Sequence, residues 1–167
     1  MTQPLPPNSL PPNVFDSRAA YVAGLDQVLA GARRELRIFD PDLSLQDLEA
    51  PVRAGKLEMF LRQGSWARLW IVLHRLDYAE RNMPRLLNLQ RRFAQSLTIR
   101  LSDGEGRRAE DCFVLADAQH VVRRAVAEQS RGVLRLNDPS ESGLLRERFD
   151  AILAGALPGI EPSVSGL

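Results

Sequence analysis

The chain has 167 residues and a formal net charge of +1; 44% of its residues are apolar and 26% are charged. These values are typical of one globular domain, and the near balance of charge excludes a strongly basic or acidic chain. The single cysteine excludes an internal disulfide, and no apolar run reaches the roughly 20 residues that span a bilayer, so we expect a cytoplasmic protein with no membrane partner.

Residues 1–14 contain five prolines and no periodic apolar pattern. They predict a disordered, proline-rich leader, and they lack the basic and apolar segments of a signal peptide. We expect one domain over residues 15–157, followed by a flexible tail over 158–167.

Helical and extended patterns alternate in the first half of the chain. Asp16 or Ser17 can cap a first helix, and a strand follows at 36–39. The inward face of that helix is expected to comprise Val22, Leu25, Leu29 and Ala32. Residues 44–47 predict the start of another helix. Pro51 suits the first turn of the next one, whose inward residues are expected to be Val52, Leu57, Phe60 and Leu61.

The run 69–73 is apolar at every position, which predicts a central strand that is covered on both faces, as in parallel sheets. One helix over 83–93 and a strand over 97–101 follow. After a loop at 102–108, strands at 111–116 and 120–122 form a hairpin, and a further strand is expected at 132–136. The last helix has the clearest start, with Asp138 as its N-cap and Pro139 in its first turn, and the chain is expected to fray after Pro158.

This order predicts an α/β fold with a mixed, largely parallel sheet that helices flank on both faces. The later strands would add antiparallel edges. No phosphate-binding loop, dinucleotide fingerprint, serine nucleophile elbow or zinc spacing is present, so no cofactor and no metal are expected.

Positive charge is concentrated in the middle of the chain. Residues 62–100 carry eight arginines and two carboxylates, a net charge of +6, whereas the flanking segments 1–61 and 101–167 are net −2 and −3. Arginine can hold phosphate oxygens through paired hydrogen bonds, but a charge run is more often a solvated helix face. The candidate contacts for nucleic acid or another polyanion are Arg81, Arg85, Arg91 and Arg92.

The stretch from Glu110 to Asp117 is a short apolar strand that runs into an acidic turn, and it resembles the strand on which phospholipase D-like proteins carry His-x-Lys-x-x-x-x-Asp. Residues i and i+2 of a strand face the same way, so in that family the histidine nucleophile and the lysine converge on one phosphodiester. The resemblance covers roughly residues 15–156. It implies one half of a phospholipase D-like fold and, by analogy, a homodimer that would bury the 110–117 region.

Further segments resemble an uncharacterised proteobacterial branch of this superfamily, whose members also occur after N-acetyltransferase modules. These segments are 78–87, 91–93, 138–139 and 148–149. In this register Asp117 holds the aspartate position, but Glu110 stands in place of the histidine and Cys112 in place of the lysine. The family's downstream Gly-Ser-x-Asn falls on Arg124-Ala125-Val126-Ala127, so the motif is degenerate and phosphohistidine catalysis is not expected.

Other polar residues lie where strands end, and in open α/β sheets ligands bind at the carboxyl ends of strands. A vestigial pocket is therefore predicted from Asp40, Asp42, His74, Arg75 and Asp117. A metal-dependent nuclease could be built from Asp40, Asp42, Glu110, Asp111 and Asp117, although no motif sets their spacing. His120 could approach Cys112 and activate it, but a buried, inert cysteine is the stronger expectation.

Three functions follow from these patterns. The first is a non-catalytic binding or assembly module, not an enzyme, that forms a homodimer or binds a protein partner. The second is binding of nucleic acid or another polyanion through residues 62–100. The third is residual or altered phosphodiester hydrolysis.

Overall fold

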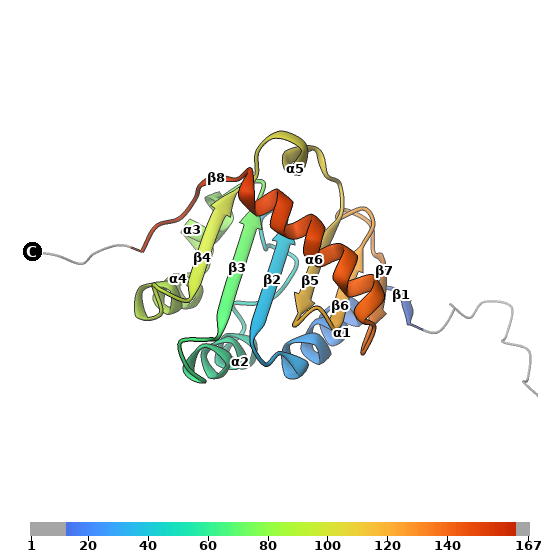
Figure 1. The fold of residues 1–167 in the computed structure, drawn as a ribbon, viewed down its shortest axis with the longest axis horizontal. Coiled ribbons are helices and arrows are strands. Elements are labelled where there is room, and N and C mark those ends of the chain that lie inside the picture. The colour runs from blue at the N-terminus through green and yellow to red at the C-terminus, as the bar shows by residue number, and fades with distance from the viewer. Residues whose placement is uncertain (1–12, 163–167) are drawn as a thin grey trace, which may run out of the picture.

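The computed structural model describes residues 13–162 and shows three layers, with one mixed β-sheet between two layers of helices (Figure 1). The strand order is β1-β7-β6-β5-β2-β3-β4-β8. The strands are β1 Val14–Asp16, β2 Glu35–Asp40, β3 Arg68–Leu73, β4 Leu97–Leu101, β5 Cys112–Ala116, β6 His120–Arg124, β7 Arg131–Arg135 and β8 Leu157–Pro158. The helices are α1 Arg18–Gly31, α2 Pro51–Arg62, α3 Asp77–Asn82, α4 Pro84–Arg92, α5 Gly104–Arg108 and α6 Pro139–Ala154.

The predicted mixed α/β sheet with helices on both faces is confirmed, but its parallel part is small. Only β2, β3 and β4 run parallel, and every other pairing in the described sheet is antiparallel. The two parallel pairings need the crossover helices that the alternating pattern predicted, whereas short connections join β5 to β6 and β6 to β7.

Two apolar clusters hold the layers together. The larger cluster packs α1, α2 and α4 against one face of the sheet, and its sheet residues include Leu36, Ile38 and Val114. The smaller cluster packs α6 against the other face around Phe113 and Phe149. Because β2 and β5 are covered on both faces, almost every residue in them is buried. Successive side chains of one strand point alternately to the face covered by α1, α2 and α4 and to the face covered by α6.

The predicted helix starts are confirmed by hydrogen bonds. The Ser17 side chain accepts from the backbone N–H of Ala20, and the Asp138 side chain accepts from that of Glu141. Val52 was expected to face inward but is 69% exposed, because the buried face of α2 comprises Ala54, Leu57, Phe60 and Leu61. In α1 the fully buried aromatic residue is Tyr21, which the predicted face omitted.

One helix prediction was wrong. Residues 44–47 form turns, because the Asp40 and Asp42 carboxylates bind the backbone N–H groups that follow them and Leu43 has a positive φ of 70°. Such local side-chain hydrogen bonds compete with helix formation. The helix predicted over 83–93 is confirmed as α4, which begins at Pro84, whereas the short helix α3 before it was not predicted. Met83 separates the two helices, with φ −124° and ψ 60°.

The structure extends past both edges of the predicted domain. Val14 pairs with Val133, and Pro158 pairs with Arg100. The expected fraying after Pro158 is not observed at Ile160, whose carbonyl oxygen accepts a 2.6 Å hydrogen bond from the buried Gln90 side chain. Residues 1–12 of the predicted leader and 163–167 of the predicted tail lie outside the described residues. Within residues 13–162, no helix combines the length and apolar character needed to cross a membrane.

Candidate functional site

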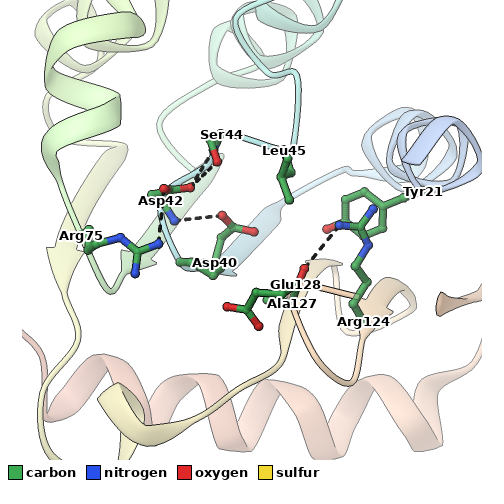
Figure 2. A pocket seen from close by; sticks show the side chains of 10 residues that line it. Tyr21, Asp40, Asp42, Ser44, Leu45, Arg75, Arg124, Ala127 and Glu128 are labelled. Atoms are coloured by element: carbon green, nitrogen blue, oxygen red, sulfur yellow. Dashed lines mark hydrogen bonds and ion pairs between the residues drawn. The ribbon is translucent and has the colours of Figure 1, made fainter. Parts of the chain in front are cut away.

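A cavity of about 80 Å³ lies where β2 and β3 end and β6 leads into the next loop, and Figure 2 shows its lining. We call it the carboxyl-end cavity. Three of the predicted pocket residues, Asp40, Asp42 and Arg75, line it. The other lining residues are Tyr21, Pro41, Ser44, Leu45, Arg124, Ala127 and Glu128.

The two aspartates have their oxygens occupied by the loop that follows β2. Asp40 accepts from the backbone N–H groups of Asp42 and Leu43 and from the Gln46 amide. Burial raises the pKa of Asp40, and these hydrogen bonds oppose that rise. Burial alone would also raise the pKa of Asp42, but hydrogen bonds from Ser44 and the Arg75 guanidinium bring it below its usual value. Both carboxylates thus shape the loop.

The opposite wall of the cavity carries a buried guanidinium. Arg124 is 3% exposed, and its guanidinium carbon lies 4.1 Å from the centroid of the Tyr21 ring, which is a cation–π arrangement (Figure 2). Its Nη1 donates a long, 3.5 Å hydrogen bond to the Ala127 carbonyl, while its Nε is buried without a partner. The burial of Arg124 was not predicted from the sequence.

Cys112 lies directly across the hairpin from Arg124, so both side chains point to the α1 face. Burial raises the pKa of the Cys112 thiol to about 12, with a further contribution from the nearby Asp40 carboxylate. Glu110, two residues earlier, is exposed, and its carbonyl oxygen accepts a hydrogen bond from the backbone of Ala127. The positions assigned to histidine and lysine therefore hold a solvent-exposed carboxylate and a protonated thiol.

His74 does not join the cavity, because it lies on the α6 face of the sheet, where its ring packs edge-on against Phe39. Its Nε2 lies 3.1 Å from the Ala109 carbonyl and its Nδ1 lies 2.6 Å from the Ser102 hydroxyl. A carbonyl can only accept, so Nε2 carries the proton and Nδ1 accepts from Ser102. Burial lowers the pKa of His74, which favours this neutral, doubly bonded ring.

Asp117 lies at the opposite end of the sheet, because β5 runs antiparallel to β2. Its carboxylate accepts three backbone hydrogen bonds from the segment between α1 and β2, at 2.5 Å from Arg33, 2.7 Å from Arg34 and 2.8 Å from Glu35. The prediction that Asp117 shares a pocket with Asp40 and Arg75 was wrong. Its observed contacts are structural.

The residues of the other predicted catalytic sites do not lie together. His120 pairs with Ala116 at the far end of the hairpin from Cys112, and its Nδ1 accepts from the Asn137 backbone. Asp111 faces α6, where Arg148 binds both of its oxygens at 2.5 and 2.6 Å. Among residues 13–162, no group of three or more histidine, cysteine, aspartate or glutamate side chains is placed to hold a metal ion.

The arginine-rich segment spreads over β3, α3, α4 and β4, and nearby carboxylates neutralise part of its charge. Arg85 lies 3.6 Å from Glu49, and Arg92 lies 2.5 Å from Glu58. Arg81 and Arg91 are exposed, and no carboxylate oxygen of the described residues lies within 4.0 Å of either guanidinium. Two of the four predicted polyanion contacts are thus already engaged in ion pairs.

The 110–117 region is also less accessible than expected, since β5 is an inner strand whose five residues are buried within a single chain. The sequence did carry one signal for the overlooked Arg124. Val122 and Arg124 are two residues apart on one strand, so their side chains point to the same face of the sheet. Because Val122 is apolar and suited to a buried face, burial of Arg124 on that face could have been predicted.

Several solved structures resemble the fold, among them TrmBL2, Nuc and NucT. TrmBL2, an archaeal chromatin protein described with a novel mode of DNA binding, aligns over 86% of this chain with a TM-score of 0.64 and 15% identity, and the chain spans about half (52%) of it. Nuc from Salmonella typhimurium, a phospholipase D family member, aligns over 86% of this chain and 95% of its own, with a TM-score of 0.57 and 14% identity. NucT from Helicobacter pylori aligns over 87% and 96%, with a TM-score of 0.60 and 10% identity.

These likenesses show the fold, and Nuc matches the phospholipase D-like half that the element order predicted. No curated protein sequence matches the chain. A family model described as Domain of unknown function (DUF7931) matches residues 17–161. The chain therefore belongs to the DUF7931 family and has a phospholipase D-like fold.

Proposed function

We propose that this protein is a non-catalytic phospholipase D-like domain that serves as a binding or assembly module, with its carboxyl-end cavity as the recognition site. One observation carries the proposal. At the positions aligned with the family's histidine and lysine, Glu110 is exposed and Cys112 is a buried thiol with a pKa of about 12. A carboxylate repels a phosphodiester, and a protonated thiol is a poor nucleophile.

Hydrolysis assays test the absence of catalysis. Wild-type protein is incubated with a chromogenic phosphodiester, with and without divalent metal, beside the Glu110→Ala and Cys112→Ser variants. We expect turnover no faster than the protein-free blank in every sample. Turnover that either substitution abolishes would overturn the proposal and favour residual or altered hydrolysis.

We further propose assembly as a homodimer through the mouth of the cavity. In phospholipase D-like proteins two halves pair with their sites at the shared interface, and here Leu45, 41% exposed, borders the cavity. Sedimentation velocity at micromolar concentration should show a dimer that Leu45→Glu weakens. The matched control is Leu144→Glu, which changes an exposed leucine on α6. A wild-type protein that sediments strictly as a monomer would overturn this assembly.

Polyanion binding through the arginine-rich segment is the second candidate function. It is supported by the exposed, unneutralised Arg81 and Arg91 and by the fold likeness to TrmBL2, a protein described as binding DNA. Fluorescence anisotropy with a labelled DNA duplex should then show affinity that falls steeply with salt. Replacing both arginines with alanine should reduce the slope of log K against log salt by about 1.8, and Arg135→Ala on β7 is the control. No measurable binding at low salt would exclude this function.

A further inference from the structure

We propose that Arg124 anchors a small-oxyanion site in the carboxyl-end cavity, which binds the phosphate or carboxylate group of a ligand. This inference rests on the proposed binding role of the same site, and it specifies the chemistry that the site recognises.

The charge of Arg124 is buried and incompletely partnered. Arginine stays protonated in proteins, so this guanidinium cannot shed its charge as a buried lysine can. Among the described residues its one hydrogen bond is the 3.5 Å contact to Ala127, its Nε has no partner, and no carboxylate oxygen lies within 4.0 Å. Buried charges are ordinarily paired and hydrogen-bonded, so this site lacks an acceptor.

Tyr21 supplies a second donor on the same wall. Its side chain is 1% exposed, and its buried hydroxyl lies beside the Cys112 thiol but has no oxygen or nitrogen hydrogen-bond partner in the described structure. The hydroxyl and the guanidinium of Arg124 both belong to residues that line the cavity (Figure 2). They project from α1 and β6, two elements packed in the main core, so their positions are set before any ligand arrives. Two preorganised donors are suited to one oxyanion.

No carboxylate that lines the cavity pairs with the Arg124 guanidinium. Asp42 is engaged by Ser44 and Arg75, and the oxygens of Asp40 accept from the loop after β2. Glu128 is exposed at the mouth, where water screens its charge. Among residues 13–162 no side chain supplies the acceptor that Arg124 lacks, and an anion from solution can supply it.

The cavity also limits what can enter it. Its volume of about 80 Å³ exceeds the ~30 Å³ that one water occupies in the liquid, but it is far smaller than the roughly 300–1,000 Å³ of pockets that enclose a whole small-molecule ligand. One phosphate or carboxylate group would therefore occupy it.

Titration of ¹⁵N-labelled protein with inorganic phosphate, and separately with acetate, tests the site. The reporter is the Nε–H of Arg124, assigned by its loss in Arg124→Met. We expect a saturable shift of this signal and, at about ten times Kd, a rise in Tm of about 3–6 °C that Arg124→Met abolishes. A shift with phosphate alone, acetate alone or both supports the site and identifies the group it takes.

Charge variants test the same site without changing Arg124, so they remain informative if Arg124→Met does not fold. Glu128→Gln removes a negative charge from the mouth and should tighten oxyanion binding about twofold to fivefold. Glu80→Gln on the exposed part of α3 is the control and should leave affinity unchanged. A wild-type Nε–H signal that responds to neither ion, with no effect of Glu128→Gln, would overturn the inference and leave water as the occupant.

The two proposals fail separately. Absence of oxyanion binding together with absence of phosphodiester turnover overturns the Arg124 site and leaves the non-catalytic module standing. Oxyanion binding accompanied by turnover that Cys112→Ser abolishes upholds the site and overturns the non-catalytic module.

Discussion

Replacement of Asp117 by asparagine isolates the role of its carboxylate. The residue has φ of 54°, in the left-handed region that asparagine also tolerates, so the substitution adds no backbone strain. It removes the negative charge and one of two acceptor oxygens, while three backbone N–H groups still point at the side chain. The new amide NH₂ must then face at least one of these donors.

The expected loss follows from these contacts. Hydrogen bonds to charged groups each contribute about 1.5–3 kcal/mol, and a donor left without its partner costs a comparable amount. Two of the three bonds are solvent-exposed, those from Arg33 and Arg34, so water compensates part of the loss. We therefore expect Asp117→Asn to lower the free energy of unfolding by about 2 kcal/mol and Tm by about 4–8 °C.

Urea unfolding followed by circular dichroism measures this change. The control is Asp103→Asn, because Asp103 is exposed and its side chain makes no capping hydrogen bond. If Asp117→Asn destabilises the protein no more than the control, the carboxylate does not hold the segment between α1 and β2, and the structural role assigned to Asp117 is refuted.

Three further substitutions or labels test other parts of the structure. Burial alone would raise the pKa of Asp111, but Arg148 and Arg123 hold it below 3.8, so its stabilising contribution is present above about pH 4 and is lost as the pH falls through the folded-state pKa. Arg148→Met should therefore lower the free energy of unfolding by about 2–3 kcal/mol at pH 7. This is less than for a fully buried ion pair, because Arg148 is 37% exposed. The difference in free energy from wild type should become smaller by about pH 3, as measured by denaturation curves of both proteins at each pH. Cys112, whose pKa rises from 9.0 to about 12, should react with a thiol reagent at pH 8 about a thousandfold more slowly than an ordinary cysteine, and equal rates in native and urea-unfolded protein would contradict its burial. In Gly132→Ala the new methyl group would lie 2.6 Å from the Arg123 carbonyl and against the Phe15 ring, so we expect a loss of about 1–3 kcal/mol and faster hydrogen exchange in β1, and unchanged exchange there would show that the space can open.

Most elements could be predicted from local signals. Capping residues marked the starts of α1 and α6, and an unbroken apolar run marked β3 as a covered central strand. Local side-chain hydrogen bonds caused the one wrong helix prediction. The carboxylates of Asp40 and Asp42 bind the backbone that the 44–47 pattern assigned to a helix. Side-chain hydrogen bonds of this kind depend on the turn geometry, which periodicity does not contain.

Three of the predicted site residues lie together because their position along a parallel strand is sufficient to place them. Asp40, Asp42 and Arg75 follow β2 and β3, and the carboxyl ends of parallel strands lie together. His74 has the same place along the chain as Arg75 but the opposite side-chain direction, which puts it on the α6 face. Asp117 follows an antiparallel strand, and its end of β5 is therefore remote from the cavity.

The amino-acid sequence by itself determined the α/β class and most element positions, because these depend on residue identity and short spacings. Only the tertiary structure decided the direction of β5, the structural role of Asp117 and the burial of Arg124 beside Tyr21. Strand direction and the choice of sheet face depend on long-range pairing. A buried guanidinium without a carboxylate emerges only when segments about 100 residues apart, α1 and β6, pack together.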